Sequence, residues 1–85
     1  MNFPVNEKGG WIVPANTEFP AGTKFPAHSV FGSECEFRQN CTFGSGCEFG
    51  SGCKFSWGCE FSNGCEFGSG CELRIPLEPH IQHRY

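Results

Sequence analysis

Hydrophobic and polar positions follow one another with a strict period of six residues along most of the chain. A large apolar residue stands at every sixth position from Phe19 to Phe67, with Val13 before this run and Leu73 after it. A small residue precedes each Phe of the run by two places. Since residues i and i+2 of a strand point to the same side, the small and the large residue should both face inward. The pattern therefore predicts short strands, each followed by a corner of three residues.

The two inward positions form one ladder of small residues and one of large residues. The small position is cysteine in seven successive units: Cys35, Cys41, Cys47, Cys53, Cys59, Cys65 and Cys71. The three units before them hold Thr17, Thr23 and Ser29 at this position. The large position is phenylalanine in nine units: Phe19, Phe25, Phe31, Phe37, Phe43, Phe49, Phe55, Phe61 and Phe67. We predict that the cysteines and the phenylalanines from Phe37 onwards form the core ladder of the fold.

Glycine marks the corners between the predicted strands. It stands three residues after the large residue in six units: Gly22, Gly46, Gly52, Gly58, Gly64 and Gly70. Glycine is favoured wherever the chain must take a positive φ. Strand and corner alternate without a break, so the sequence predicts an all-β fold, a single small β-solenoid whose coils stack about 4.8 Å apart. We expect an N-terminal cap at residues 1–10, the solenoid at 11–75, and a C-terminal tail or cap at 76–85.

Two known repeat families have a similar pattern of small residues, large residues and corners. The segment "FGSGCE" resembles the unit of hexapeptide-repeat left-handed β-helices, with Phe in place of the usual aliphatic residue. The segment "CEFGS" resembles a pentapeptide repeat to which one residue has been added. The period of six favours the triangular form with about 18 residues per coil. The Phe at the central position favours the pentapeptide form, because three Phe per coil would crowd pockets sized for leucine.

Composition and charge narrow the function classes. The chain has 85 residues, ten of them Phe, twelve Gly and seven Cys, and a net charge of −3. This charge argues against a basic patch that binds nucleic acid directly. No apolar run is long enough to span a membrane, and the first ten residues lack a secretion signal. We therefore expect a cytoplasmic protein with reduced thiols, in the host bacterial cytoplasm if a phage encodes it.

The cysteines are expected to pack rather than to react. A coil of about 18 residues would stack Cys35, Cys53 and Cys71 in one column, with the other four in two further columns. Disulfides along a column are disfavoured, because parallel Cβ vectors suit the disulfide dihedral poorly. There is no CxxC motif, and His28 is the one histidine within the repeat. Thr and Ser fill the same position upstream, so we predict no metal, no cofactor and no catalytic residue.

The residue between each small and large residue should point to solvent. A coil of about 18 residues sorts these positions into three faces. The first carries Glu18, Glu36, Lys54 and Glu72, the second Val30, Glu48 and Glu66, and the third Lys24, Thr42 and Glu60. We predict a binding surface made of Glu36, Glu48, Glu60, Glu66, Glu72 and Trp57. Trp57 belongs to it because it stands at a corner where other units have small residues.

Other residues outside the ladders are assigned to the ends of the solenoid. Trp11 occupies the small-residue phase and is expected to cap the first coil. His80 and His83 give a weak metal signal, and a cap or dimer contact is the favoured interpretation. Uncovered coil ends invite pairing of edge strands, so a homodimer through the coil ends is a further hypothesis.

The favoured function hypothesis is inhibition by mimicry of nucleic acid. Carboxylates repeated along a rigid rod resemble the charge pattern of a nucleic-acid backbone, and would be steered to a protein that normally binds nucleic acid. Pentapeptide-repeat proteins act on topoisomerase in this way. In size and surface the chain also resembles small phage anti-CRISPR proteins, which implies a CRISPR effector complex as the partner.

Two alternatives stay open. One is a structural or assembly module, such as a spike tip or an ice-binding solenoid, although the outward column carries Glu and Lys rather than paired threonines. The other is a hexapeptide-type acyltransferase, an enzyme class that needs more coils and a histidine at a subunit groove. His28 would be the sole candidate within the coils.

Overall fold

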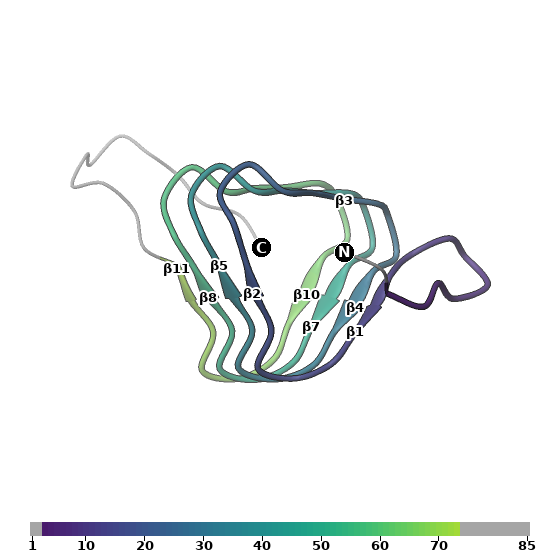
Figure 1. The fold of residues 1–85 in the computed structure, drawn as a ribbon, viewed down its shortest axis with the longest axis horizontal. Coiled ribbons are helices and arrows are strands. Elements are labelled where there is room, and N and C mark those ends of the chain that lie inside the picture. The colour runs from purple at the N-terminus through teal and green to yellow at the C-terminus, as the bar shows by residue number, and fades with distance from the viewer. Residues whose placement is uncertain (1–2, 74–85) are drawn as a thin grey trace.

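The computed structural model describes residues 3–73, and these residues form a β-solenoid of about 3 turns with about 18 residues per turn. Eleven two-residue strands follow one another, and no helix occurs in this part of the chain. Viewed near its axis, the solenoid has a three-sided outline with coils stacked in register (Figure 1). The predicted all-β solenoid is therefore confirmed. The division into residues 1–10, 11–75 and 76–85 stays a prediction, and residues 74–85 lie outside the description.

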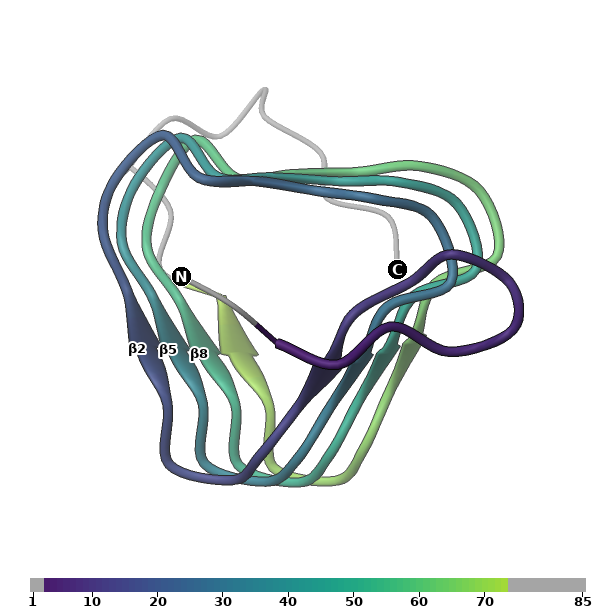
Figure 2. The same cartoon turned by 45° about the vertical axis from the view of Figure 1, so that its right-hand side comes forward.

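Each side of the solenoid is one parallel sheet. The first sheet holds β1 (Ile12–Val13), β4 (Val30–Phe31), β7 (Glu48–Phe49) and β10 (Glu66–Phe67). The second holds β2 (Glu18–Phe19), β5 (Glu36–Phe37), β8 (Lys54–Phe55) and β11 (Glu72–Leu73). The third holds β3 (Lys24–Phe25), β6 (Thr42–Phe43) and β9 (Glu60–Phe61). Figure 2 shows the strands of the second sheet side by side.

Hydrogen bonds between coils hold this register. Val30 pairs with Glu48, and Glu48 with Glu66, each the next residue of the same face. The Glu48 N–H donates to the Ser29 carbonyl of the preceding coil over 2.9 Å. At the corners the direction reverses, and the His28 N–H donates to the Ser45 carbonyl of the following coil over 2.8 Å. Strands of only two residues are thus supported by ladders that run the length of the solenoid.

A residue with positive φ stands at every corner between successive strands from β1 to β11. Six of these are the predicted glycines Gly22, Gly46, Gly52, Gly58, Gly64 and Gly70. The other four are Asn16, His28, Glu34 and Asn40, with φ of 62–65°. Asparagine and histidine are enriched in this region among non-glycine residues, whereas glutamate adopts it at a greater cost. The coil therefore imposes a positive φ at each corner, and glycine is the residue that adopts it at the lowest cost.

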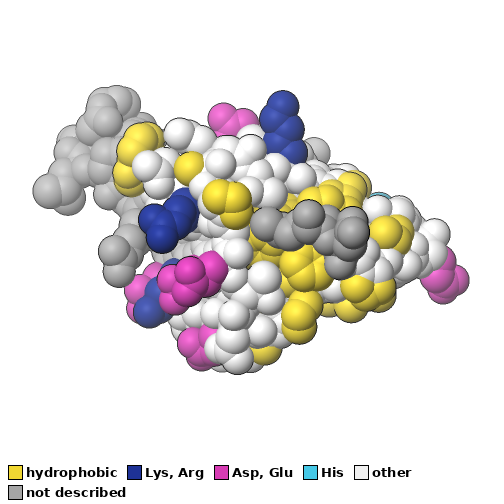
Figure 3. Space-filling model, viewed as in Figure 1, with side chains coloured by type: hydrophobic (Ala, Val, Ile, Leu, Met, Phe, Trp, Pro, Cys, Tyr) yellow, Lys and Arg dark blue, Asp and Glu magenta, His cyan; other side chains and the backbone are white. Residues whose placement is uncertain are grey.

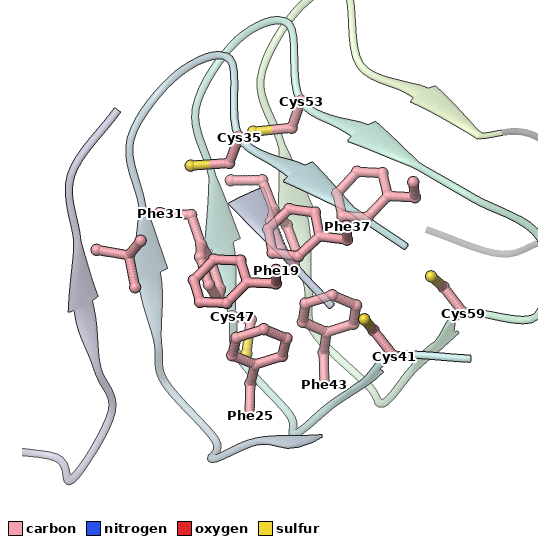
Figure 4. Close-up of a cluster of buried hydrophobic side chains, with 13 residues drawn as sticks. Phe19, Phe25, Phe31, Cys35, Phe37, Cys41, Phe43, Cys47, Cys53 and Cys59 are labelled. Atoms are coloured by element: carbon pink, nitrogen blue, oxygen red, sulfur yellow. The ribbon is translucent and has the colours of Figure 1, made fainter. Parts of the chain in front are cut away.

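Phenylalanine rings fill the interior in three stacks. Rings one coil apart lie nearly parallel, as for Phe37 and Phe55, whose centroids are 4.9 Å apart at 4°. Rings of neighbouring sheets meet edge to face, as for Phe37 and Phe43 at 5.1 Å and 84°. Figure 4 shows the rings turned toward the centre, with the cysteines around them. Both geometries are favourable for aromatic pairs, so three Phe per coil fit without the expected crowding.

The N-terminal end of the solenoid is covered by residues 3–11. The Phe3 ring lies 5.9 Å from Trp11 and 5.7 Å from Phe19, and Trp11 meets Phe25 edge-on at 5.4 Å. Val5 pairs antiparallel with Trp11, which occupies the outer edge of the first sheet. A non-repeating segment thus ends the sheet, as isolated edges require.

Candidate functional site

The cysteine ladder lies in the core. Cys35, Cys41, Cys47 and Cys53 are 0% exposed and Cys59 is 8% exposed, while Cys65 and Cys71 in the last described coil are half-buried. Every thiol donates to a backbone carbonyl of the preceding coil, as from Cys53 Sγ to the Gly32 oxygen over 3.4 Å. All seven cysteines are free. The thiols are therefore hydrogen-bonded packing groups in this structure.

The hydroxyls upstream use the same acceptors. Ser29 Oγ donates to the Pro26 carbonyl over 2.8 Å, and Cys47 of the next coil donates to that oxygen over 3.5 Å. Thr17 and Cys35 share the Pro14 carbonyl in the same manner. The column therefore requires a small side chain with a polar hydrogen, and both a hydroxyl and a thiol meet this requirement.

Burial and hydrogen bonding shift the pKa values of the core thiols in both directions. Desolvation raises the pKa of Cys47 to about 11. The pKa of Cys53 and of Cys59 is also raised, first by the hydrogen-bonded thiol of the preceding coil and then by burial. A thiol is nucleophilic and binds metals as the thiolate, so the raised pKa disfavours both roles for these three cysteines. Hydrogen bonds with the Cys53 and Cys59 thiols, by contrast, lower the pKa of Cys35 and of Cys41 to about 7. No group of three or more potential metal ligands occurs among residues 3–73.

The free energy of unfolding should decrease in alkaline solution because of the Cys47 thiol. The folded protein keeps the Cys47 proton between about pH 9 and 11, where the unfolded chain releases it. Stability is thus complete below about pH 9 and decreases as the pH rises toward 11. Urea unfolding at about pH 8 and about pH 10.5 measures the effect, and Cys47→Ala should reduce its size. A urea midpoint equal at both pH values would contradict this.

The structure distributes the predicted carboxylates over all three sheets. Glu48 and Glu66 are in-register neighbours of the first sheet. Lys54 lies between Glu36 and Glu72 on the second sheet, and Glu60 follows Thr42 on the third. Every one of these carboxylates is exposed. Only Glu48 and Glu66 therefore form an uninterrupted acidic pair among the predicted binding residues.

The second sheet is mixed in charge. Its outer surface contains a groove of about 220 Å³ lined by Glu18, Glu36, Arg38, Lys54 and Ser56, together with Phe19, Phe37 and Phe55, whose rings are buried in the core. Figure 3 shows acidic and basic side chains close together over this sheet. Acidic and basic side chains in one groove cancel much of each other's electric field. The second sheet is therefore a weaker candidate than the first for attracting a cationic partner.

Trp57 stands at the corner after β8 and is 49% exposed. Its carbonyl accepts the Asn40 N–H of the preceding coil over 3.2 Å, which fixes the corner backbone beneath the indole. Large aromatic side chains on rigid backbones are common anchors at protein interfaces.

Sequence reasoning missed two features near the first sheet. Ile12 is 43% exposed and lies beside Val30, and extending the outward phase by one coil would have found it. The loop at residues 6–10 also borders this sheet. Asn6 holds the loop, donating from Nδ2 to the His28 carbonyl and accepting from the Lys8 and Gly10 N–H groups. No sequence repeat signals this loop, because it occurs once.

A scan against protein-family models finds no match, and neither the curated proteins nor the solved structures contain a matching chain. Within residues 3–73 no helix is long and apolar enough to cross a membrane.

Proposed function

We propose that this protein is a non-enzymatic inhibitor that presents outward carboxylates to a protein target that normally binds nucleic acid. The observation that carries the proposal is the in-register pair Glu48 and Glu66 on a sheet whose outward column contains no cation. Successive carboxylates are held about 4.8 Å apart by the strand spacing. Like charges so close destabilise the sheet, and the fold bears this cost.

The overall charge supports the same function. The chain carries nine Glu against six Lys and Arg, a net charge of −3 with histidine neutral. The carboxylates project from a backbone that is hydrogen-bonded between coils, so their points of attachment are fixed before binding. An array of one sign accelerates association with a cationic surface and competes there with phosphates.

The target we propose is a CRISPR effector complex, and the solenoid is of the hexapeptide-like kind. The three-sided coil of about 18 residues supports the hexapeptide-like form. The anti-CRISPR assignment rests on the small size and the acidic surface of the chain. Catalysis is not part of the proposal, since Cys35, Cys41, Cys47 and Cys53 are fully buried and lie away from the surface.

The test is competition for DNA on a purified CRISPR surveillance complex. Wild type should displace a fluorescent target DNA, and added salt should weaken this effect. The combined charge reversal Glu48→Lys, Glu60→Lys and Glu66→Lys should reduce inhibition at least about tenfold.

Lys54→Glu is the matched control, because it joins Glu36 and Glu72 into one acidic column. It should inhibit as well as wild type or better. Equal inhibition by wild type and the triple reversal, or inhibition unaffected by salt, would refute the proposal.

A further inference from the structure

The outer face of the first sheet is divided into an apolar half and an acidic half. Its outward column runs Ile12, Val30, Glu48, Glu66 in consecutive coils. Ile12 is 43% and Val30 38% exposed, although both are branched aliphatic residues. The two apolar side chains are direct neighbours, and so are the two carboxylates.

This face differs from the other two in charge. The second and third sheets carry Lys54 and Lys24 in their outward columns, whereas no basic residue stands in that of the first. The carboxylates of the first sheet consequently have no cation within their own column, and Lys8, which lines the depression bordered by Glu48, stands beside the column in the loop together with Glu7. An occupant with positive charge opposite Glu48 and Glu66 would supply one.

The edge of this face is hollowed where the loop at residues 6–10 projects beside it. A depression of about 220 Å³ is lined by Asn6, Glu7, Lys8, His28, Val30, Gly46 and Glu48. It joins the apolar and acidic halves, because Val30 and Glu48 both border it. The loop is held by the bonds of Asn6, so one side of the face has a fixed wall.

The spacing of the column matches the turns of a helix. Four residues about 4.8 Å apart span about 14 Å, and a helix rises about 5.4 Å per turn. A helix lying along the column would therefore place one side chain per turn opposite each outward residue. Its side chains would read aliphatic, aliphatic, basic, basic at positions i, i+4, i+7 and i+11.

We propose that the first sheet docks an amphipathic helix of its partner, with aliphatic residues on Ile12 and Val30 and basic residues on Glu48 and Glu66. This proposal rests on the proposed function, and it specifies the surface and the chemistry that the target supplies. Contact with Ile12 and Val30 would position the helix on the sheet. Pairing of its basic residues with Glu48 and Glu66 would decide which way it runs along the column. Proteins that bind nucleic acid contact phosphates with Arg and Lys side chains, and such side chains would supply the basic half of the helix.

The probe is a fluorescent alanine-rich helical peptide with Leu, Leu, Arg and Arg at positions i, i+4, i+7 and i+11. A peptide of identical composition, with the leucines and arginines on opposite sides of the helix, is its control. Fluorescence anisotropy with the whole protein measures binding at low salt. The designed peptide should bind at least about tenfold more tightly than the control peptide.

Conservative variants keep the fold while changing the face. The pair Ile12→Thr and Val30→Thr should weaken binding about tenfold, and so should the pair Glu48→Gln and Glu66→Gln. Thr42→Val with Glu60→Gln on the third sheet is the matched control and should change binding less than about twofold. Circular dichroism on every variant verifies that the solenoid is intact.

Three results would overturn the docking proposal: equal binding of both peptides, no binding of the designed peptide up to about 1 mM, or equal weakening by the third-sheet control. The inhibition assay distinguishes failure of the docking proposal from failure of the proposed function. If the triple charge reversal abolishes inhibition while the designed peptide does not bind, the target recognises these carboxylates with something other than such a helix. If the reversal leaves inhibition unchanged, the proposed function itself falls.

Discussion

Replacing Phe37 by alanine should lower the free energy of unfolding by about 3–5 kcal/mol. The ring is 2% exposed and stacks between Phe19 and Phe55 at centroid distances of 5.3 and 4.9 Å. It also meets the edges of rings on both other sheets, including Phe31 and Phe43 at 5.2 and 5.1 Å. Neighbouring rings are held by backbone ladders and cannot collapse into the space, so the cavity persists. Urea denaturation followed by circular dichroism measures the loss.

Two comparison variants identify the cause as the missing ring. Phe37→Leu keeps more of the volume and should cost less than Phe37→Ala. Phe61→Ala should also cost less, because that ring is half-buried in the last described coil. A loss below about 1 kcal/mol for Phe37→Ala would mean that the stacked rings do not hold the solenoid together.

Deleting one whole coil should leave a folded, shorter solenoid. Removal of residues 36–53 joins Cys35 to Lys54, which takes the place of Glu36 on the same sheet. Every later residue then keeps its face and its inward or outward direction, because coils contact only their neighbours. We expect a strand-type circular dichroism spectrum and a cooperative transition at lower temperature, since one layer of the core is lost.

A deletion three residues shorter should abolish the fold. Removal of residues 36–50 places Gly52 at an inward large position and shifts all later cysteines and phenylalanines out of phase. Shifting the phase turns the hydrophobic set away from the core, as a register slip does in any sheet. Equal stability of the two deletion variants would show that the six-residue phase does not govern folding.

The repeated part of the fold was predictable because packing and backbone geometry act on each unit in the same way. The inward Phe and the positive-φ glycines such as Gly46 are required in every coil, so the pattern stands out in one sequence. Glu34 and His28 were not identified as positive-φ residues, because a coil imposes this conformation even on residues that carry a Cβ. The residue type of Glu34 gives no hint of it.

The candidate site was only partly predictable, because packing does not act on its residues. Outward side chains are not selected by packing, so their period of 18 had to be inferred from the coil size. That inference placed Glu48 beside Glu66 correctly. The neighbourhood of Ile12 depends on a non-repeating loop, for which the repeat offers no guide. The partner proposed to bind the first sheet cannot be predicted from the repeat, because the repeat records only which residues pack in the core.

Three sides of six residues close one coil, so that every face repeats after one full turn. A nuclear Overhauser experiment on the isotope-labelled protein tests it directly. Backbone contacts should join parallel, in-register pairs such as Val30 with Glu48, Glu36 with Lys54, and Thr42 with Glu60. Contacts of Glu36 with a strand residue other than Glu18 and Lys54, its neighbours in the preceding and following coils, or an antiparallel pattern between coils, would contradict the coil and every surface inferred from it.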